Sequence, residues 1–527
     1  MPTIVTRRVA LRARSIEILI EPGRDGQPLY VQLYRQLRDL ITSGTLQMGT
    51  AIPAARVLAS DLKISRNTVE AAISRLNSEG YVTRRVGAGT IVADLRDAAP
   101  FLLRSRRLQL SRDAARVGAS SPRRGDEEGA ATTLGPVPLL GLSERGEVLS
   151  SAGRAERDAD RRVSTCTADV LRFPLRTWNR TLSRAARDLG TSALDAEEVQ
   201  GNAALRTAIA EHARLTRGVR CTADHVLIVS STQQALDLIG RLLVSPGDLA
   251  LVEEPGYPSA RAVFRAAGAD VRGLAVDRQG IQTDHLANYP SATLLYLTPS
   301  HQFPLGVTLN LRRRQAALAW ARTQGAWIVE DDYDSEFRYD GRPIAAMQGI
   351  DQSDRVLYVG TFNKVLFPAM RIGYLILPPQ LVDAFVSARR LVDGGSPTLV
   401  QAALADFMIN GHFTAHIRRA RRVYEARRDV LVESLRSSQV RGWTIGPSDT
   451  GLHLVAHLAD SVDDHALAAT CAGFGLGVAP LSHYYAEASD PAHRARGLVL
   501  SFGAATERAI RDAVKVLTQA ARPPRAR

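Results

Sequence analysis

The feature that most constrains the fold is an alternation of short apolar segments with helical patterns from residue 173 onward. The apolar segments are rich in Val, Ile, Leu and Tyr, and the stretches between them have the spacing of amphipathic helices. Segments that are apolar on both faces suit strands buried between two layers of helices, so we predict an α/β domain with a mostly parallel sheet. The predicted strands are residues 225–229, 249–252, 293–297, 327–330, 356–359 and 374–377.

Polar residues follow two of the predicted strands at their carboxyl ends, where sheets of this kind bind ligands. Residues 230–232 read Ser-Ser-Thr and open a helical pattern. Such a helix start offers N–H groups and hydroxyls to a phosphate, although serines also cap helices for stability alone. Residues 330–334 read Glu-Asp-Asp-Tyr-Asp, and these carboxylates would repel one another without a positive partner. A protonated pyridine nitrogen or a metal ion would supply that charge.

A lysine stands in the apolar, glycine-flanked stretch 360–374 of a chain whose 67 basic residues are almost all arginine. Arginine does not form an ordinary Schiff base with an aldehyde, so a lysine retained in this place suggests amine chemistry. The alternative is a surface lysine whose stem lies on apolar neighbours. The lysines of the chain are Lys63, Lys364 and Lys515.

The first hundred residues predict a winged helix-turn-helix. Apolar spacing, Pro53 and a capping Ser65 indicate helices at 29–43, 54–62 and 66–76. Residues 81–92 alternate around a glycine-containing turn, which predicts a two-stranded wing. In this arrangement the N-terminal turn of the third helix enters the major groove. The expected DNA contacts are Arg56, Ser65, Arg66, Asn67, Thr68, Arg84 and Arg85.

Length and charge suggest several domains and an anionic partner. The 527 residues exceed one ordinary domain, and a net charge of +13 favours nucleic acid, although an arginine-rich proteome would give the same figure. We expect a DNA-binding domain at 22–95, a flexible linker at 96–165 that lacks sustained periodicity, and a large domain at 166–527.

The expected compartment is the cytoplasm. The sequence has neither an apolar run of membrane-spanning length nor the apolar core of a secretory signal. Cys166, Cys221 and Cys471 are odd in number and far apart, which fits a reducing compartment and gives no metal-binding spacing. We expect no bound metal.

The motifs in both domains resemble known families. The first domain resembles the GntR family in residues 52–56 (Ile-Pro-Ala-Ala-Arg), 65–69 (Ser-Arg-Asn-Thr-Val) and 87–90 (Gly-Ala-Gly-Thr), with alanines at 54 and 55 where that family has serines. The large domain resembles fold-type I aminotransferases in residues 360–374, 330–334 and 298–306 (Thr-Pro-Ser-His-Gln-Phe-Pro-Leu-Gly). Together they resemble the MocR-type subfamily of GntR regulators. The resemblance implies an α/β domain with a smaller C-terminal subdomain beyond about residue 419.

The same resemblance implies pyridoxal 5′-phosphate (PLP) as cofactor, held as an internal aldimine on Lys364. Asp331 would pair with the pyridine nitrogen and Tyr333 would hydrogen-bond the ring oxygen. The phosphate ligands would be Ser231, Thr232, Thr361 and Arg371. Tyr257 would stack on the ring, and either His301 or Gln302 would lie beside the ring oxygen; packing or turn roles stay open for Tyr257, His301 and Gln302.

Two departures from the aminotransferase pattern bear on function. Asn363 replaces the serine that commonly precedes the lysine, and Val499 stands where many aminotransferases carry an arginine for the substrate carboxylate. Because of Val499 we expect no net turnover of ordinary α-amino acids unless another arginine takes over, and partial transaminase activity stays open. The predicted function is a PLP-dependent transcription regulator that binds operator DNA as a head-to-tail homodimer and senses PLP or an amine-bearing effector. The alternative is a catalytically active aminotransferase.

Overall fold

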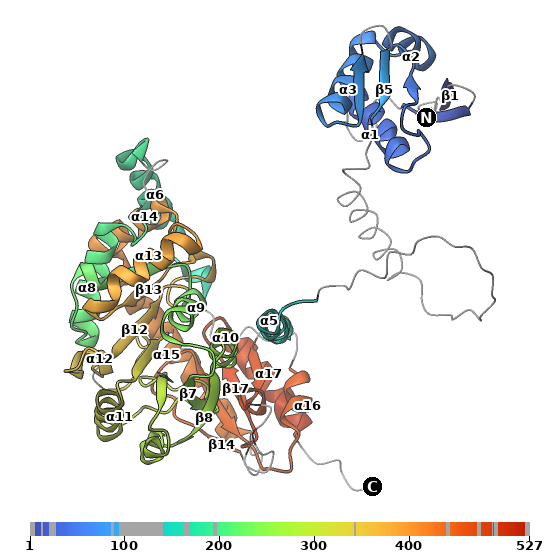
Figure 1. Cartoon of the computed structure of the whole chain (residues 1–527). Coiled ribbons are helices and arrows are strands. Elements are labelled where there is room, and N and C mark those ends of the chain that lie inside the picture. The colour runs from blue at the N-terminus through green and yellow to red at the C-terminus, as the bar shows by residue number, and fades with distance from the viewer. Residues whose placement is uncertain are drawn as a thin grey trace, which may run out of the picture. The chain divides into compact units, whose positions relative to one another are not determined.

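The computed structural model contains two compact units, Met1–Pro136 and Val137–Arg527, which we call the head and the body (Figure 1). The described residues are 6–11, 14–20, 28–85, 89–93, 141–162, 168–192, 198–341, 344–438, 443–471, 476–486, 489 and 494–521. Within these ranges no helix combines the length and the apolar character needed to cross a membrane.

The head packs helices around one apolar core and adds a small antiparallel sheet in the order β3-β5-β4. The buried face of the third helix consists of Val69, Ala72, Ile73 and Leu76, as its helical spacing predicts. The helices and the wing strands are thus confirmed. Their bounds are α1 (Leu29–Thr42), α2 (Ala55–Leu62), α3 (Arg66–Ser78), β3 (Ala51–Ile52), β4 (Val82–Arg85) and β5 (Gly89–Val92).

A further hairpin precedes α1. Strands β1 (Thr6–Leu11) and β2 (Arg14–Leu19) pair antiparallel, and Ile18 and Ile20 are buried in the core of the head. The head therefore begins before residue 22, the boundary expected from the sequence. The hairpin escaped prediction because its strands are short and interspersed with arginines, so no sustained apolar alternation marks them.

The body is organised on an eight-stranded sheet with the order β6-β13-β12-β11-β10-β7-β8-β9. The neighbouring strands in the order β12-β11-β10-β7-β8 pair in parallel, whereas β13 runs antiparallel to both β12 and β6, and β9 runs antiparallel to β8. The six predicted strands are confirmed, and the partly exposed β8 was not predicted. The bounds are β6 (Val226–Val229), β7 (Leu249–Glu254), β8 (Asp270–Asp277), β9 (Gly280–Ile281), β10 (Ala292–Leu297), β11 (Trp327–Asp332), β12 (Val356–Thr361) and β13 (Gly373–Ile376).

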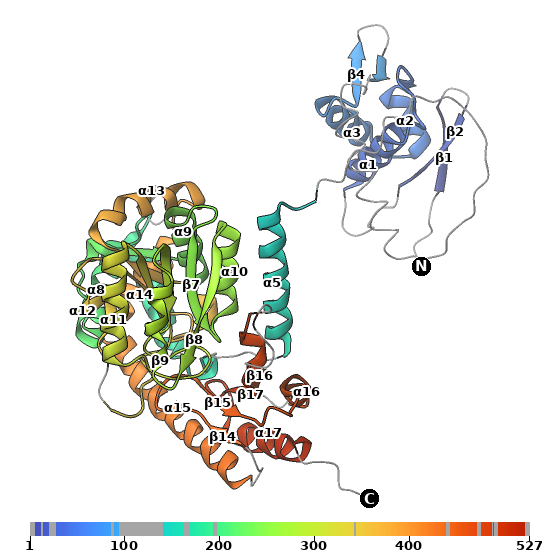
Figure 2. The ribbon, with the colours of Figure 1, turned by 60° about the horizontal axis from the view of Figure 1, so that its bottom comes forward.

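Helices cover both faces of this sheet (Figure 2). Leu227 and Val229 of β6 enter the core under α9 and α10, whereas Val226 and Ile228 enter the core shared with α8, α14 and α15. Both faces of the strand are therefore apolar, as predicted. The helices are α6 (Leu175–Leu189), α8 (Ala203–Arg217), α9 (Thr232–Leu243), α10 (Pro258–Ala267), α11 (Leu311–Gln324), α12 (Met347–Ile350), α13 (Val382–Val392), α14 (Thr398–Ile409) and α15 (His412–Ser437).

A smaller C-terminal subdomain follows α15, as expected. It consists of an antiparallel sheet with the order β14-β15-β17-β16, which shares part of the body's largest core. Its elements are β14 (Thr444–Ile445), β15 (His453–His457), α16 (Asp464–Ala469), β16 (Gly477–Pro480), β17 (Gly497–Ser501) and α17 (Glu507–Ala520).

One helix lies within the segment 96–165 that was expected to be an irregular linker. Helix α5 (Glu144–Arg162) packs against α10 (Figure 2). Its half-buried positions include the small residues Gly146 and Ala152, and only Val148 adds a sizeable apolar side chain there. Because this contact uses small residues, no apolar periodicity reveals the helix. The linker prediction is wrong for residues 144–162, and residues 94–140 and 163–167 lie outside the described part of the chain.

Candidate cofactor site and nucleic-acid interface

The antiparallel β13 brings distant parts of the body to one edge of the sheet. Gly373, the first residue of β13, is paired with Val229 at the end of β6 and with Thr361 at the end of β12. Ser231 follows β6 and Arg371 precedes β13, so the register gathers Ser231, Thr361 and Arg371 at this edge. These are three of the four predicted phosphate ligands.

The fourth, Thr232, is the first residue of α9 and is half-buried. The hydroxyl of Ser231 caps this helix by accepting a hydrogen bond from the Gln234 backbone N–H at 3.2 Å. The Gln234 side chain accepts from Ser230 N at 2.8 Å and from the fully buried guanidinium of Arg389. The helix start is therefore fixed in place, with its positive dipole end directed where a phosphate is expected.

Lys364 lies on a loop that is closed by side chains. Thr361 Oγ1 accepts from the Asn363 N–H at 3.2 Å, and Asn363 Oδ1 accepts from the Ile372 N–H at 3.2 Å. Asn363 thus ties the two ends of the loop together, which gives this departure from the family pattern a structural role. Arg371 is exposed and has a left-handed φ of 51°. Lys364 is half-buried.

Asp331 has a carboxylate oxygen suited to a cationic ring nitrogen. Its Oδ2 accepts a hydrogen bond from the Tyr296 hydroxyl at 2.7 Å, while its buried Oδ1 has no hydrogen-bond partner within the described ranges. Burial raises the pKa of Asp331 to about 7; the Tyr296 hydrogen bond and the charge of Lys364 oppose that rise. A protonated pyridine nitrogen would satisfy Oδ1 and stabilise the ionised carboxylate. These residues therefore fit PLP.

The neighbouring carboxylates have other partners. Asp332 accepts from Arg217 Nε at 2.7 Å and from the Tyr358 hydroxyl at 2.5 Å. Burial opposes ionisation of Asp332, but the Arg217 charge and the hydrogen bonds from Tyr358, Ser335 and Arg217 together outweigh it and lower the pKa. Glu330 accepts from the backbone N–H groups of Met347 and Gln348, both at 2.9 Å. Of the four carboxylates in residues 330–334, one is thus available and two have structural partners, while the fourth, Asp334, pairs with His301.

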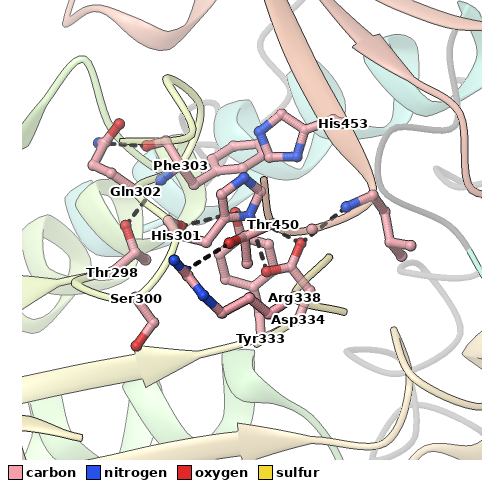
Figure 3. Close-up of polar contacts among 12 residues, drawn as sticks. Thr298, Ser300, His301, Gln302, Phe303, Tyr333, Asp334, Arg338, Thr450 and His453 are labelled. Carbon is pink, nitrogen blue, oxygen red and sulfur yellow. Dashed lines mark hydrogen bonds and ion pairs between the residues drawn. The ribbon is translucent and has the colours of Figure 1, made fainter. Parts of the chain in front are cut away.

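A second polar cluster lies beside the predicted ring-oxygen ligand (Figure 3). His301 Nδ1 is 3.0 and 3.1 Å from the two oxygens of Asp334, and the Tyr333 hydroxyl lies 3.1 Å from the same nitrogen. His453 of β15 contacts Pro304 O at 3.0 Å through Nε2. Burial, together with the charges of His301 and Lys364, holds the pKa of His453 well below its usual range.

The remaining predicted ligands lie near Phe303. Tyr257 accepts from Gln233 Nε2 at 2.8 Å, and its ring is edge-on to Phe303 with a centroid distance of 5.9 Å. Gln302 donates to the carbonyls of Pro255 and Phe303 at 2.9 and 2.7 Å. Its amide therefore holds the main chain, whereas His301 contacts Tyr333.

Val499 contributes to an apolar wall. It is fully buried in β17 and packs with Val455, Ala479, Leu481 and Tyr484. The position where many aminotransferases would have an arginine is thus part of a small hydrophobic core. A guanidinium there would need an ionic partner that this cluster does not provide.

The predicted DNA-binding residues lie at the starts of α2 and α3 and on the wing. Arg56, Arg66 and Asn67 are exposed. Ser65 Oγ caps α3 by accepting from the Thr68 N–H at 3.0 Å, and it lies 2.8 Å from the Thr68 hydroxyl. Arg84 on β4 pairs with Glu70 at 2.8 Å, and the Arg85 side chain lies outside the described part of the chain.

Two family models match the chain. The gntR family of bacterial regulatory proteins covers residues 29–92, and aminotransferase class I and II covers residues 173–492. The probable rhizopine catabolism regulatory protein MocR of Rhizobium meliloti is 38% identical over 94% of both chains. The chain belongs to the MocR-type branch of the GntR family of transcription regulators.

Other relatives of this MocR-type regulator agree with that assignment. The pyridoxine biosynthesis regulator PdxR of Corynebacterium glutamicum is 29% identical over 91% of this chain and 93% of its own. Among solved structures, the kynurenine aminotransferase of Pyrococcus horikoshii is 25% identical, with a TM-score of 0.63 over 73% of this chain and 95% of that chain. The predicted family, the two-part architecture and the DNA-binding class are confirmed.

The structure of the MocR-type body also contains site residues that the sequence did not reveal. Tyr296 reaches Asp331 from the adjacent strand β10. Phe303 lies edge-on to Tyr257, Tyr333 and Tyr484. The one available signal was the tyrosine at 296 in an otherwise aliphatic strand. The role of Phe303 depends on a tertiary contact between loops, for which the sequence has no local signature.

Proposed function

We propose that this MocR-type regulator binds PLP through Lys364 and controls its DNA binding through the occupancy of that site. The observation that carries the proposal is the buried Asp331 carboxylate, whose Oδ1 has no hydrogen-bond partner among the described residues. Burial raises the pKa of this carboxylate and the charge of Lys364 lowers it, so the carboxylate and Lys364 interact electrostatically. When bound, PLP supplies an aldehyde that reacts with amines and a ring that withdraws electrons.

The residues of the chain have distinct parts in this proposal. Asp331 keeps the pyridine nitrogen protonated, and Tyr333 donates to the ring oxygen. Tyr257 stacks on the ring, and Phe303 supports Tyr257 through an edge-on contact. The phosphate is bound at the gathered strand ends by Ser231, Thr232, Thr361 and Arg371.

The effector is PLP itself or a small amine that reacts at the same site. Relatives named for pyridoxine biosynthesis and for rhizopine catabolism support a small-molecule signal of this kind. We propose a head-to-tail homodimer, in which a change in the body alters how two heads are presented to operator half-sites. The apolar setting of Val499 argues against turnover of ordinary α-amino acids as the main activity.

DNase footprinting on the DNA upstream of the chain's own gene tests the proposal. We expect protection of spaced half-sites by the native chain, and we expect PLP to change that protection. Lys364→Ala should retain DNA binding and lose both the response to PLP and the borohydride-reducible absorbance, because the variant lacks the amine. Lys515→Ala is the matched control, since Lys515 is exposed in α17 and pairs with Asp512.

Two results would contradict the proposal. A reducible PLP absorbance that survives in Lys364→Ala would reject the assignment of the lysine. Absence of any protected site at moderate salt, with and without PLP, would reject the regulatory function and favour an aminotransferase.

A further inference from the structure

The polar cluster in Figure 3 contains a buried acid–imidazole pair that contacts a predicted cofactor ligand. His301 and Asp334 are 2% and 1% exposed. His301 Nδ1 faces both carboxylate oxygens at 3.0 and 3.1 Å and the Tyr333 hydroxyl at 3.1 Å. The pair is therefore in a position to orient Tyr333.

The hydrogen-bond pattern assigns the protons. Because an ionised carboxylate accepts only, the Nδ1 facing Asp334 carries the hydrogen. That N–H points to the Asp334 and Tyr333 oxygens, so the tyrosine hydroxyl must direct its own proton elsewhere. In this structure it donates to the His301 carbonyl oxygen at 3.0 Å. A ring oxygen of bound PLP would compete with that carbonyl for the same proton.

The C-terminal subdomain also contacts the Asp334–His301 pair, through Gly451 and Leu452. The backbone N–H of Leu452 donates to Asp334 Oδ2 at 3.3 Å. Gly451 has a φ of 80°, and a Cβ there would lie 2.0 Å from His301 Cε1 and 2.6 Å from Asp334 Oδ2. Only glycine permits this close approach.

The same short segment is tied to the loop that follows Asp334. Gly451 N donates to Phe337 O at 2.8 Å, and the Tyr339 hydroxyl donates to Gly451 O at 2.6 Å. The segment that leads into β15 and the loop after β11 therefore form one hydrogen-bonded unit. A displacement of the C-terminal subdomain would act directly on the acid–imidazole pair.

We propose that Asp334 and His301 are a positioning pair that fixes the Tyr333 hydroxyl, and that Gly451 and Leu452 couple this pair to the C-terminal subdomain. The proposal rests on the proposed function, since Tyr333 is there the ligand of the PLP ring oxygen. The pair couples PLP binding to the position of the C-terminal subdomain. Displacement of the subdomain weakens the hydrogen bond from the Tyr333 hydroxyl to the PLP ring oxygen, and loss of that hydrogen bond makes displacement of the subdomain easier.

The test is a pH titration of the absorbance of bound PLP in the full chain. A hydrogen bond donated to the ring oxygen stabilises the form in which that oxygen is negative. Tyr333→Phe is therefore expected to raise the pH midpoint of this absorbance titration by about half a pH unit to one pH unit. Asp334→Asn loosens Tyr333, which raises the midpoint, but it also removes a negative charge, which lowers the midpoint.

A double-mutant cycle separates these two effects, because the charge effect is common to both backgrounds. We expect Asp334→Asn to lower the midpoint in Tyr333→Phe, where only the charge effect remains, and to give a more positive shift than this in the native chain. His301→Gln, which lacks the imidazole Nδ1–H, should show the same coupling to Tyr333→Phe. Asp270→Asn is the matched control, since Asp270 pairs with the exposed Arg272 on β8, outside this unit, and is expected to leave the midpoint unchanged.

Equal shifts in both backgrounds, in variants that keep their PLP content and unfolding temperature, would overturn the positioning role. His301, Asp334 and His453 could also hold a metal ion, because their ligand atoms lie within 4.8 Å of one another. Elemental analysis that finds a stoichiometric transition metal, lost in Asp334→Asn, would overturn it as well. Failure of the native chain to bind PLP would reject the proposed function instead.

Discussion

At the scale of single residues, burial disfavours the ionised form of several carboxyl groups in the body, among them Glu253, Glu330 and Asp331. Burial raises the pKa of Glu253 and of Asp331 to about 7 in each case. Glu253 is compensated by hydrogen bonds from the N–H of Thr298, at 3.0 Å, and from its hydroxyl. Asp331 has one such bond, from Tyr296, and its second oxygen is unpaired among the described residues. Because of this difference, Asp331 and not Glu253 has an oxygen available to bind a cationic ligand.

Asp331 should therefore make the stability of the PLP-free chain depend on pH. Its pKa in the folded state, about 7, lies above that of an ordinary carboxyl, so its stabilising contribution is complete only at low pH and is lost as pH rises to about 7. An asparagine at this position stays neutral at every pH. We expect Asp331→Asn to raise the free energy of unfolding of the body at pH 8, by on the order of a few kcal/mol, and to change it little at pH 4.

Thermal unfolding of PLP-free protein at the two pH values measures this effect, and PLP affinity is the companion measurement. The same substitution should weaken PLP binding, because an amide does not hold the pyridine nitrogen in its protonated form. A stabilisation of equal size at both pH values would show that the pKa of Asp331 is not raised in the PLP-free chain.

At the scale of elements, the start of α3 combines a structural and a recognition role. Ser65 caps the helix whose first turn carries Arg66 and Asn67. We expect Ser65→Ala to cost the head about 1 kcal/mol of unfolding free energy and to weaken operator binding, because the first turn frays. Ser74→Ala on the exposed face of the same helix is the control. Chemical denaturation and DNA titration of both variants give the comparison, and equal losses would contradict the capping role.

The elements that sequence reasoning found are those with a strong local signal. Strands such as β6 and β12 are buried on both faces, and α3 has both a cap and an apolar stripe. The helix α5 and the strands β1 and β2 were missed, since their contacts depend on small residues or on a few isoleucines. The Lys364 stretch was identified from chemistry, but the contact of Tyr296 with Asp331 depends on strand order, which composition does not encode.

At the scale of the whole molecule, the charge of +13 makes DNA affinity sensitive to salt. Arg84 on the wing pairs with Glu70 at 2.8 Å. We expect Arg84→Gln to reduce the slope of log affinity against log salt by about 0.9, equally for operator and random DNA. Glu70→Gln should strengthen binding, because it releases Arg84 and removes a negative charge. Fluorescence anisotropy over a salt series measures both.

Arg508 in the body is the matched control for this series, as its side chain is 93% exposed. We expect Arg508→Gln to leave the slope unchanged. A slope reduced to the same extent in both arginine variants would mean that DNA also contacts the body.

The closed loop between β12 and β13 has a consequence for how such chains can diverge. Asn363 ties its start to Ile372 at its end, and both Lys364 and Arg371 lie between these ties. An insertion or deletion between Asn363 and Ile372 would displace the Lys364 amine relative to the Arg371 guanidinium and strain or break the tie. Substitutions elsewhere in the loop change only local packing. We therefore expect related chains to keep the length of this segment more strictly than its amino-acid sequence, even where they recognise different effectors.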